Sequence, residues 1–309
     1  MISFRARLVR LLTRQMFKKM SPTDHIPKHR ADWEDMAARL KPASEVRLRH
    51  ATIAGTDCDW LVPNGSDESR VLLYLHGGAY IMGSSRTHRA MVSHIAREAG
   101  VRALLPNYRL APEYPFPAGL EDCIAVYRAL LDAGIPSERI AIAGDSAGGG
   151  MTMATLLSLR DAGVALPAAG CLLSPWLDLA AAGESIHSRA DKDPWFNPHD
   201  MPIIVAYYCR EKQVKSPLVS PVYADVRGMP PMLVQVGDHE ILLSDATRIV
   251  DRINAAGGQA TLQVWPDMWH VFQYFVGKMP ESMRAIEDIG AFLKLQLATA
   301  SARAGNKAA

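Results

Sequence analysis

Residues 144–148 of the 309-residue chain read Gly144-Asp145-Ser146-Ala147-Gly148, a Gly-x-Ser-x-Gly sequence. An apolar run that predicts a strand precedes it, and a run that predicts a helix follows. That context is the strand–turn–helix of a nucleophile elbow. Such a turn holds the serine hydroxyl clear of a sheet, at the positive end of the next helix. We therefore predict a nucleophilic serine; a plain serine in a glycine-rich turn is the alternative.

The segment His76-Gly77-Gly78-Ala79 directly follows another predicted strand. A glycine pair leaves backbone N–H groups unshielded, and such donors can hold the negative oxygen that forms when an acyl carbonyl is attacked. We expect Gly77 and Gly78 to supply two donors and Ala147, the residue after the nucleophile, a third. The alternative is a turn that merely ends a strand. The histidine is expected to order the loop rather than to react.

A serine nucleophile needs a base, and in hydrolases with such an elbow the order along the chain is serine, acid, histidine. The histidines after Ser146 are His187, His199, His239 and His270. Only His270 follows a late predicted strand by a short loop, so we predict that it is the base.

Two carboxylates are candidates for the acid. Asp238 and Glu240 both follow the predicted strand at 232–236, and either could fix the histidine tautomer and stabilise its charged form. Spacing alone does not choose between them. Asp245 is expected to lie in the next helix with a structural role, and Asp145 to brace the nucleophile loop.

These groups must be positioned by alternating strands and helices, which imply a mostly parallel sheet with helices on both faces. Ligands bind beyond the carboxyl ends of such strands. We expect antiparallel strands at 46–53 and 58–62, then strands at 71–75, 101–106, 139–143, 170–173, 232–236 and 260–264. We expect helices at 87–98, 117–133, 148–162, 244–256 and 283–297, and a frayed tail at 298–309.

Two segments fall outside this alternation. Residues 1–45 look helical, with breaks at Pro22 and Pro27, and residues 183–216 look like an insertion. We expect the two segments to form a cap over the site, with surface excursions as the alternative.

The chain begins with a basic amphipathic pattern. Such a helix could contact an anionic membrane surface. We favour a helix that lays its apolar stripe on the protein body and leaves its basic residues solvated. The basic residues are Arg5, Arg7, Arg10, Arg14, Lys18 and Lys19, and the apolar ones are Leu8, Leu11, Leu12, Met16 and Phe17.

Composition narrows the class of protein. Hydrophobic residues make up 49% and charged residues 21%, as in ordinary globular chains. The net charge of +2 is too small to suggest a nucleic-acid partner. Arginines interrupt the first apolar runs, which disfavours a signal peptide, and no run approaches the ~20 residues of a membrane span. Four widely spaced cysteines form no metal-type pair, so we expect a reduced, cytoplasmic setting.

Taken together, the motifs resemble the bacterial hormone-sensitive-lipase-like esterases. The resemblance extends over about residues 45–295 and rests on 76–78, 144–148, Tyr-Arg-Leu-Ala-Pro-Glu at 108–113, 174–179 and 270–272. It implies a single α/β-hydrolase domain over 1–309, with cap elements at about 1–45 and 183–216, and no cofactor. It implies hydrolysis of short to medium acyl esters of small molecules through an acyl-enzyme intermediate. A homodimer is compatible with the sequence.

The resemblance also bears on the acid. In the family an Asp usually stands two residues before a Leu; here Glu240 precedes Leu242, which selects Glu240 over Asp238. Ala79 replaces a third glycine, a change we expect to affect the pocket rim more than the donors. The alternatives are a non-catalytic small-molecule receptor on the same fold, and an amidase or acyltransferase.

Overall fold

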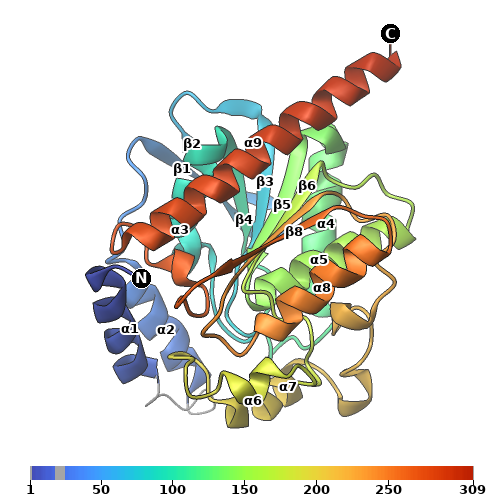
Figure 1. Cartoon of the computed structure of the whole chain (residues 1–309). Helices are drawn as coiled ribbons and strands as arrows, with labels where there is room; N and C mark the ends of the chain where they lie inside the picture. Colours follow the sequence, from blue (N-terminus) through green and yellow to red (C-terminus); the bar gives the residue numbers. More distant parts are fainter. Residues whose placement is uncertain (1, 18–24, 309) are drawn as a thin grey trace.

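A twisted sheet runs through the centre of the computed structural model, which describes residues 2–17 and 25–308 (Figure 1). Within these residues the sheet has eight strands in the order β1-β2-β4-β3-β5-β6-β7-β8. β1 and β2 are antiparallel, β2 is antiparallel to β4, and the other neighbours are parallel. The strands are β1 Val46–Ile53, β2 Thr56–Pro63, β3 Asp67–Leu75, β4 Val101–Pro106, β5 Ile140–Asp145, β6 Ala169–Leu173, β7 Met232–Gly237 and β8 Ala260–Trp265.

Helices cover both faces of the sheet, as predicted (Figure 1). α3 (Ser85–Ala99) and α9 (Pro280–Ala308) bury one face, and α4 (Ala118–Asp132), α5 (Ala147–Asp161) and α8 (Leu243–Ala255) bury the other. β5 and β6 are buried along their whole length, because helices cover both faces of the sheet.

The sheet order reverses at β3, which lies between β4 and β5. Open α/β sheets bind ligands at such a reversal, beyond the carboxyl ends of the strands. Leu75 at the end of β3 is in register with Gly144 near the end of β5. The loop after β3 and the serine turn after β5 are therefore neighbours.

The remaining elements lie mainly at that end of the sheet (Figure 1). α1 (Phe4–Phe17) and α2 (Ile26–Ala37) precede the sheet, and α6 (Ser185–Ser188) and α7 (Met201–Tyr208) lie in the inserted segment. Pro22 lies outside the described residues. Pro27 is in the first turn of α2, where its missing N–H costs nothing, so it begins the helix rather than breaking one. Short 3₁₀ turns lie at Ser137–Arg139, Pro198–Asp200, Glu211–Gln213, Pro221–Tyr223 and Phe272–Tyr274.

Two predictions about the ends of the chain are wrong. The tail is not frayed, because α9 continues to Ala308. Its last turns are rich in alanine, which favours a helix without tertiary contacts. At the other end, we predicted that the first helix lays its apolar stripe on the protein body. Instead, α1 faces the body through Ala6 and Thr13, whereas Leu8, Leu11 and Leu12 are exposed. Lys18 and Lys19 lie outside the described residues.

No helix in residues 2–17 and 25–308 has the length and apolar character needed to cross a bilayer.

Candidate active site

Ser146 occupies the turn between β5 and α5, with φ 52° and ψ −123°. A positive φ in a residue other than glycine costs about 1–3 kcal/mol and persists only where the surroundings enforce it. Here the Ser146 N–H donates to the carbonyl of Leu173, and its carbonyl accepts from the N–H of Trp176, both at 2.9 Å. The predicted sharp turn is confirmed, and β6 with the loop after it holds the turn in place.

Both glycines of the Gly-x-Ser-x-Gly sequence are required by close backbone packing. A Cβ on Gly148 would overlap the carbonyl oxygens of Leu75 and His76, and one on Gly144 would overlap the carbonyl oxygen of Gly148. These obstacles are backbone atoms, which cannot rotate aside.

Gly148→Ala is therefore expected to lower the free energy of unfolding by about 3 kcal/mol, since added carbon in a packed core forces backbone shifts. Urea denaturation monitored by far-UV circular dichroism measures the change. Gly305→Ala is the control: Gly305 also lies in a helix, but it has open space around its Cβ position. Equal losses in the two variants would contradict the packing argument.

His270 lies in the loop after β8 and is held by Glu240. The His270 Nδ1 atom is 2.9 Å from Glu240 Oε2. The other oxygen, Oε1, accepts hydrogen bonds from the Ser174 hydroxyl at 2.8 Å and from the Gly237 N–H at 2.6 Å. Glu240 is fully buried, and these hydrogen bonds to both of its oxygens fix the orientation of the carboxylate. In this arrangement a carboxylate can accept the Nδ1 proton of a histidine, which leaves Nε2 free to act as a base.

Asp238, the competing acid, points elsewhere. Its Oδ1 atom accepts a hydrogen bond from the Asp267 N–H at 2.6 Å, and its side chain is 37% exposed. The structure brings Glu240 to His270 and leaves Asp238 at the surface.

Ser174 is a site residue whose function sequence reasoning missed. It directly follows β6, has φ 46°, and its hydroxyl accepts from the Val271 N–H at 3.0 Å while donating to Glu240. One hydroxyl thus connects the acid to the loop that carries His270. Its position directly after a buried parallel strand was the available signal.

The glycine loop differs from the prediction in one donor. The Gly77 N–H donates to Asp145 Oδ1 at 3.0 Å, so it is occupied and does not face the cavity. Gly78 and Ala79 line the cavity, with φ 125° and 55°. Among the described residues, no acceptor binds the N–H groups of Gly78, Ala79 or Ala147. The Ala79 N–H therefore replaces that of Gly77 as a candidate donor.

Asp145 holds that loop, as expected of a bracing residue. Its carboxylate also accepts from the Tyr74 hydroxyl at 2.9 Å and lies 3.2 Å from His88 Nε2. Burial alone would raise the pKa of Asp145, but nearby His88 and the hydrogen bonds from Tyr74 and Gly77 lower it below its usual value. His76 stacks on Tyr108 with ring centroids 4.2 Å apart. Burial lowers the pKa of His76 to about 3, so this histidine stays neutral and orders the loop.

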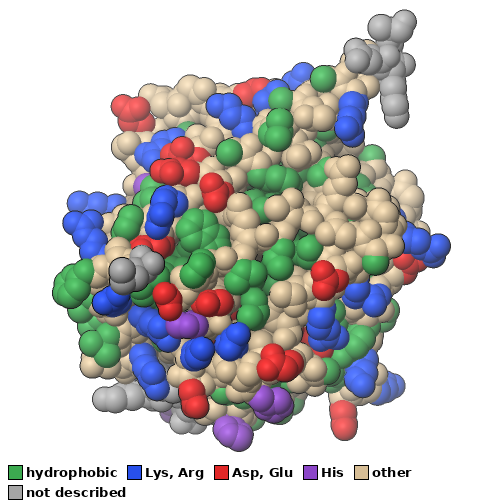
Figure 2. Space-filling view, viewed as in Figure 1, with side chains coloured by type: hydrophobic (Ala, Val, Ile, Leu, Met, Phe, Trp, Pro, Cys, Tyr) green, Lys and Arg blue, Asp and Glu red, His purple; other side chains and the backbone are tan. Residues whose placement is uncertain are grey.

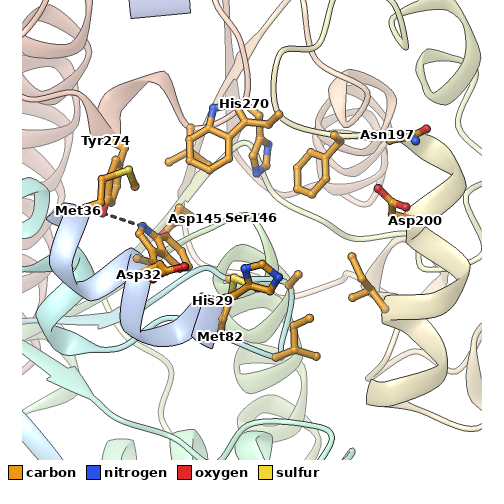
Figure 3. Close-up of a pocket in the computed structure, with 18 residues that line it drawn as sticks. His29, Asp32, Met36, Met82, Asp145, Ser146, Asn197, Asp200, His270 and Tyr274 are labelled. Carbon is orange, nitrogen blue, oxygen red and sulfur yellow. Dashed lines mark hydrogen bonds between the residues drawn. The ribbon is translucent and has the colours of Figure 1, made fainter. Parts of the chain in front are cut away.

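A cavity of about 200 Å³ contains both Ser146 and His270 (Figure 3). No hydrogen bond joins the Ser146 hydroxyl to His270 Nε2 among the described residues; such bonds are often long before substrate binds. Phe196 packs edge-on against His270 at 4.7 Å between ring centroids. Two segments distant in sequence complete the wall: His29, Asp32, Trp33 and Met36 from α2, and Trp195, Phe196, Asn197, Asp200 and Ile204 from the inserted segment.

Some aromatic side chains close to the glycine loop belong to the core and do not line the cavity. Tyr80 stacks on Tyr208 at 3.9 Å between ring centroids, and both are buried away from the cavity. Arg109 and Glu113 lie in the same six-residue segment but bind different partners. Arg109 binds Asp122, with nitrogen and oxygen 2.8 Å apart.

Glu113 instead binds Arg30 of α2 at 2.7 Å. Arg30 also donates to the carbonyl oxygens of Ile81 and Ala111. Its guanidinium therefore ties α2 to the end of the glycine loop.

Asp193, in the inserted segment, is a second residue whose role was missed. It is fully buried. One oxygen accepts from the N–H groups of Trp195 and Phe196, and the other accepts from the Ile241 N–H at 3.0 Å. Asp193 thus ties the aromatic wall of the cavity to the residue after Glu240. Burial raises its pKa to about 6; His270 and the Ile241 N–H oppose this shift, and Glu240 adds to it.

This shift makes a pH prediction. The Asp193 pKa rises from 3.8 to about 6 on folding, so between these pH values the folded chain binds more protons than the unfolded chain. The contribution of this group to stability is therefore largest below pH 4 and is lost as the pH rises through 6. Asp193→Asn should remove this loss, shifting the stability difference between the two proteins by about 3 kcal/mol in favour of the variant between pH 4 and 7. Urea titrations at both pH values test it; a pH-independent difference would contradict it.

Among the described residues, no three His, Cys, Asp or Glu side chains are grouped as metal ligands.

A sequence profile described as the alpha/beta hydrolase fold matches residues 72–274. The structure superposes with a TM-score of 0.91 on an esterase of the bacterial hormone-sensitive lipase family; the two are 45% identical, and the match covers 96% of this chain and 99% of the other. The chain belongs to this family.

Curated relatives of this chain are also named as ester-cleaving enzymes. An acetyl-hydrolase of Streptomyces hygroscopicus is 42% identical over 82% of this chain and 83% of its own length. An esterase of Acinetobacter venetianus is 33% identical over 84% and 86%. As a hormone-sensitive-lipase-like α/β-hydrolase, the chain is a carboxylic-ester hydrolase.

Proposed function

We propose that the chain hydrolyses short to medium acyl esters with Ser146 as nucleophile, His270 as base and Glu240 as the orienting acid. One observation carries the proposal. The serine on the sharp turn and the histidine held by Glu240 line the same cavity.

The proposed reaction has two steps. His270 Nε2 takes the proton of the Ser146 hydroxyl as its oxygen attacks the ester carbonyl carbon, and the N–H groups of Gly78, Ala79 and Ala147 hold the resulting oxyanion. The C–O bond to the alcohol then breaks, and His270 returns the proton to the leaving oxygen. Water, deprotonated by the same histidine, attacks the acyl-serine and releases the acid.

Size supports small substrates. The cavity of about 200 Å³ is below the ~300–1,000 Å³ typical of pockets for drug-sized ligands. A related esterase, EstE5, 38% identical with a TM-score of 0.91, has been soaked with p-nitrophenyl butyrate. We propose that residues 1–45 and 183–216 form the cap that limits chain length, since side chains from both segments line the cavity.

Initial rates with p-nitrophenyl acetate, butyrate, hexanoate, decanoate and palmitate test the proposal. kcat/KM should be highest among the three shortest esters and at least about tenfold lower for palmitate, whose chain exceeds the cavity. A serine-reactive phosphonate should label one serine, identified as Ser146 by peptide mass spectrometry. Absence of both turnover and label would favour a receptor; label with anilide turnover exceeding ester turnover would favour an amidase.

Two further properties stay predictions. We propose a cytoplasmic location, which the four buried, unpaired cysteines support; fractionation of the source cells tests it. Light scattering during gel filtration tests whether the chain forms a homodimer.

A further inference from the structure

α1 turns its large apolar side chains outward. Phe4 is 79% exposed, Leu8 48%, Leu11 54% and Leu12 49%. Their spacing of i, i+4, i+7 and i+8 places them on one helical face. Single exposed apolar residues are normal, but four on one face of one helix form a patch. We call these four residues the outer face of α1.

The opposite face of α1 is fixed to the body, so the outer face is not the result of an undocked helix. The Ser3 N–H and hydroxyl donate to the two carboxylate oxygens of Glu281 at 2.7 and 2.9 Å. Ala6 is fully buried beside Trp269 and Phe272. The Arg10 guanidinium donates to the Lys192 carbonyl at 3.0 Å. These contacts hold the outer face toward solvent.

Exposed arginines flank the outer face. Arg5 lies along one side of it, and Arg7 and Arg14 along the other. Figure 2 shows hydrophobic and basic side chains gathered together over the α1 region at the left edge of the molecule. An apolar ridge between basic borders is the arrangement of helices that lie in the interface of a bilayer.

We propose that α1 docks on an anionic lipid surface. The outer face would enter the headgroup–acyl boundary while Arg5, Arg7 and Arg14 bind lipid phosphates. Charge favours this occupant over a second copy of the chain. Two outer faces pressed together would bring the same arginines against one another, whereas an anionic bilayer neutralises them. This inference does not depend on the proposed catalytic residues.

Vesicle co-sedimentation of the full chain tests the proposal. Vesicles containing phosphatidylglycerol should bind at least about tenfold more tightly than pure phosphatidylcholine, and binding should weaken as salt rises from about 0.1 M to about 1 M. Leu8→Ser/Leu11→Ser should weaken binding to the anionic vesicles at least about tenfold, because each leucine loses its apolar burial. Arg7→Gln/Arg14→Gln should weaken it about twentyfold and leave binding to neutral vesicles unchanged.

Leu295→Ser is the matched control, since Leu295 is 61% exposed but lies on α9. It should bind as wild type does. All variants should keep the wild-type unfolding midpoint and the wild-type rate on a soluble ester, because the substituted side chains are exposed and none of them lines the cavity. Equal affinity of wild type for the two kinds of vesicle would overturn the proposal. A second outcome would also overturn it: wild type that binds no vesicles and forms a dimer in ultracentrifugation, which Leu8→Ser/Leu11→Ser converts to a monomer.

Discussion

Ser146→Ala is expected to lower kcat/KM for p-nitrophenyl acetate by about 10⁴-fold or more. The variant lacks the oxygen that we propose to form the acyl-enzyme. Members of a catalytic triad act as a unit, so removing one of them costs nearly as much as removing all three. Residual turnover should reflect the backbone donors and substrate binding alone. Rates at substrate concentrations well below KM give the value directly.

The fold should survive this change, because an alanine side chain keeps the Cβ and the substitution leaves the backbone bonds of the turn in place. Ser158→Ala is the control on α5, the helix that follows Ser146: Ser158 donates to the Ala154 carbonyl within α5 and lies outside the cavity. It should retain activity within about twofold, as ordinary substitutions away from a site do. Ser146→Ala with more than a few per cent of wild-type activity would disprove the serine mechanism.

Glu240→Gln is expected to lower kcat by about 10⁴-fold while leaving the structure intact. The amide has nearly the shape of the carboxylate, but it cannot stabilise an imidazolium. Its NH₂ group can donate to Nδ1, which moves the histidine proton to Nε2, where a base is needed. Chemistry, rather than binding, should therefore fail, and KM should change little.

Asp238→Asn is the matched control, because this acid lies two residues away and binds the Asp267 N–H instead of His270. It should retain kcat within about twofold. If Asp238→Asn were the more damaging of the two substitutions, the assignment of Glu240 would be wrong.

The sequence predicted the core well because its signals are local. Buried parallel strands read as continuous apolar runs, and strands such as β1 and β4 were predicted to the residue. Ser146 was found through the turn between such a strand and a helix, and His270 through the order of elements that place it near the serine. The first inference uses a pattern within a few residues, and the second uses the order of serine, acid and histidine along the chain.

Long-range contacts account for what was missed. The orientation of the Gly77 N–H is set by Asp145, which is 68 residues away and is itself fixed by Tyr74 and His88. Asp193 binds the Ile241 N–H across 48 residues. No periodicity or local spacing reports such pairings. Spacing likewise could not separate Glu240 from Asp238, and only the family resemblance did.

The same limit applies to α1. Its helical period was visible, but a period does not say which face of a helix meets the protein. The face of α1 that contacts the protein body carries the small Ala6 and follows Ser3, which binds Glu281. Small side chains are needed there because α1 lies close to α9 and the last loops.

The buried hydrogen bond between Asp193 and the Ile241 N–H restricts which cap segments could be exchanged between this chain and its relatives. Caps are attractive units to exchange between relatives when a different acyl length is wanted. Here, however, the Asp193 carboxylate binds both the inserted segment and the residue after Glu240. A transplanted cap segment without an acid at the position of Asp193 would leave the Ile241 N–H without this acceptor, directly beside Glu240. Successful chimaeras should therefore be those that retain this aspartate or bring their own acceptor for that amide.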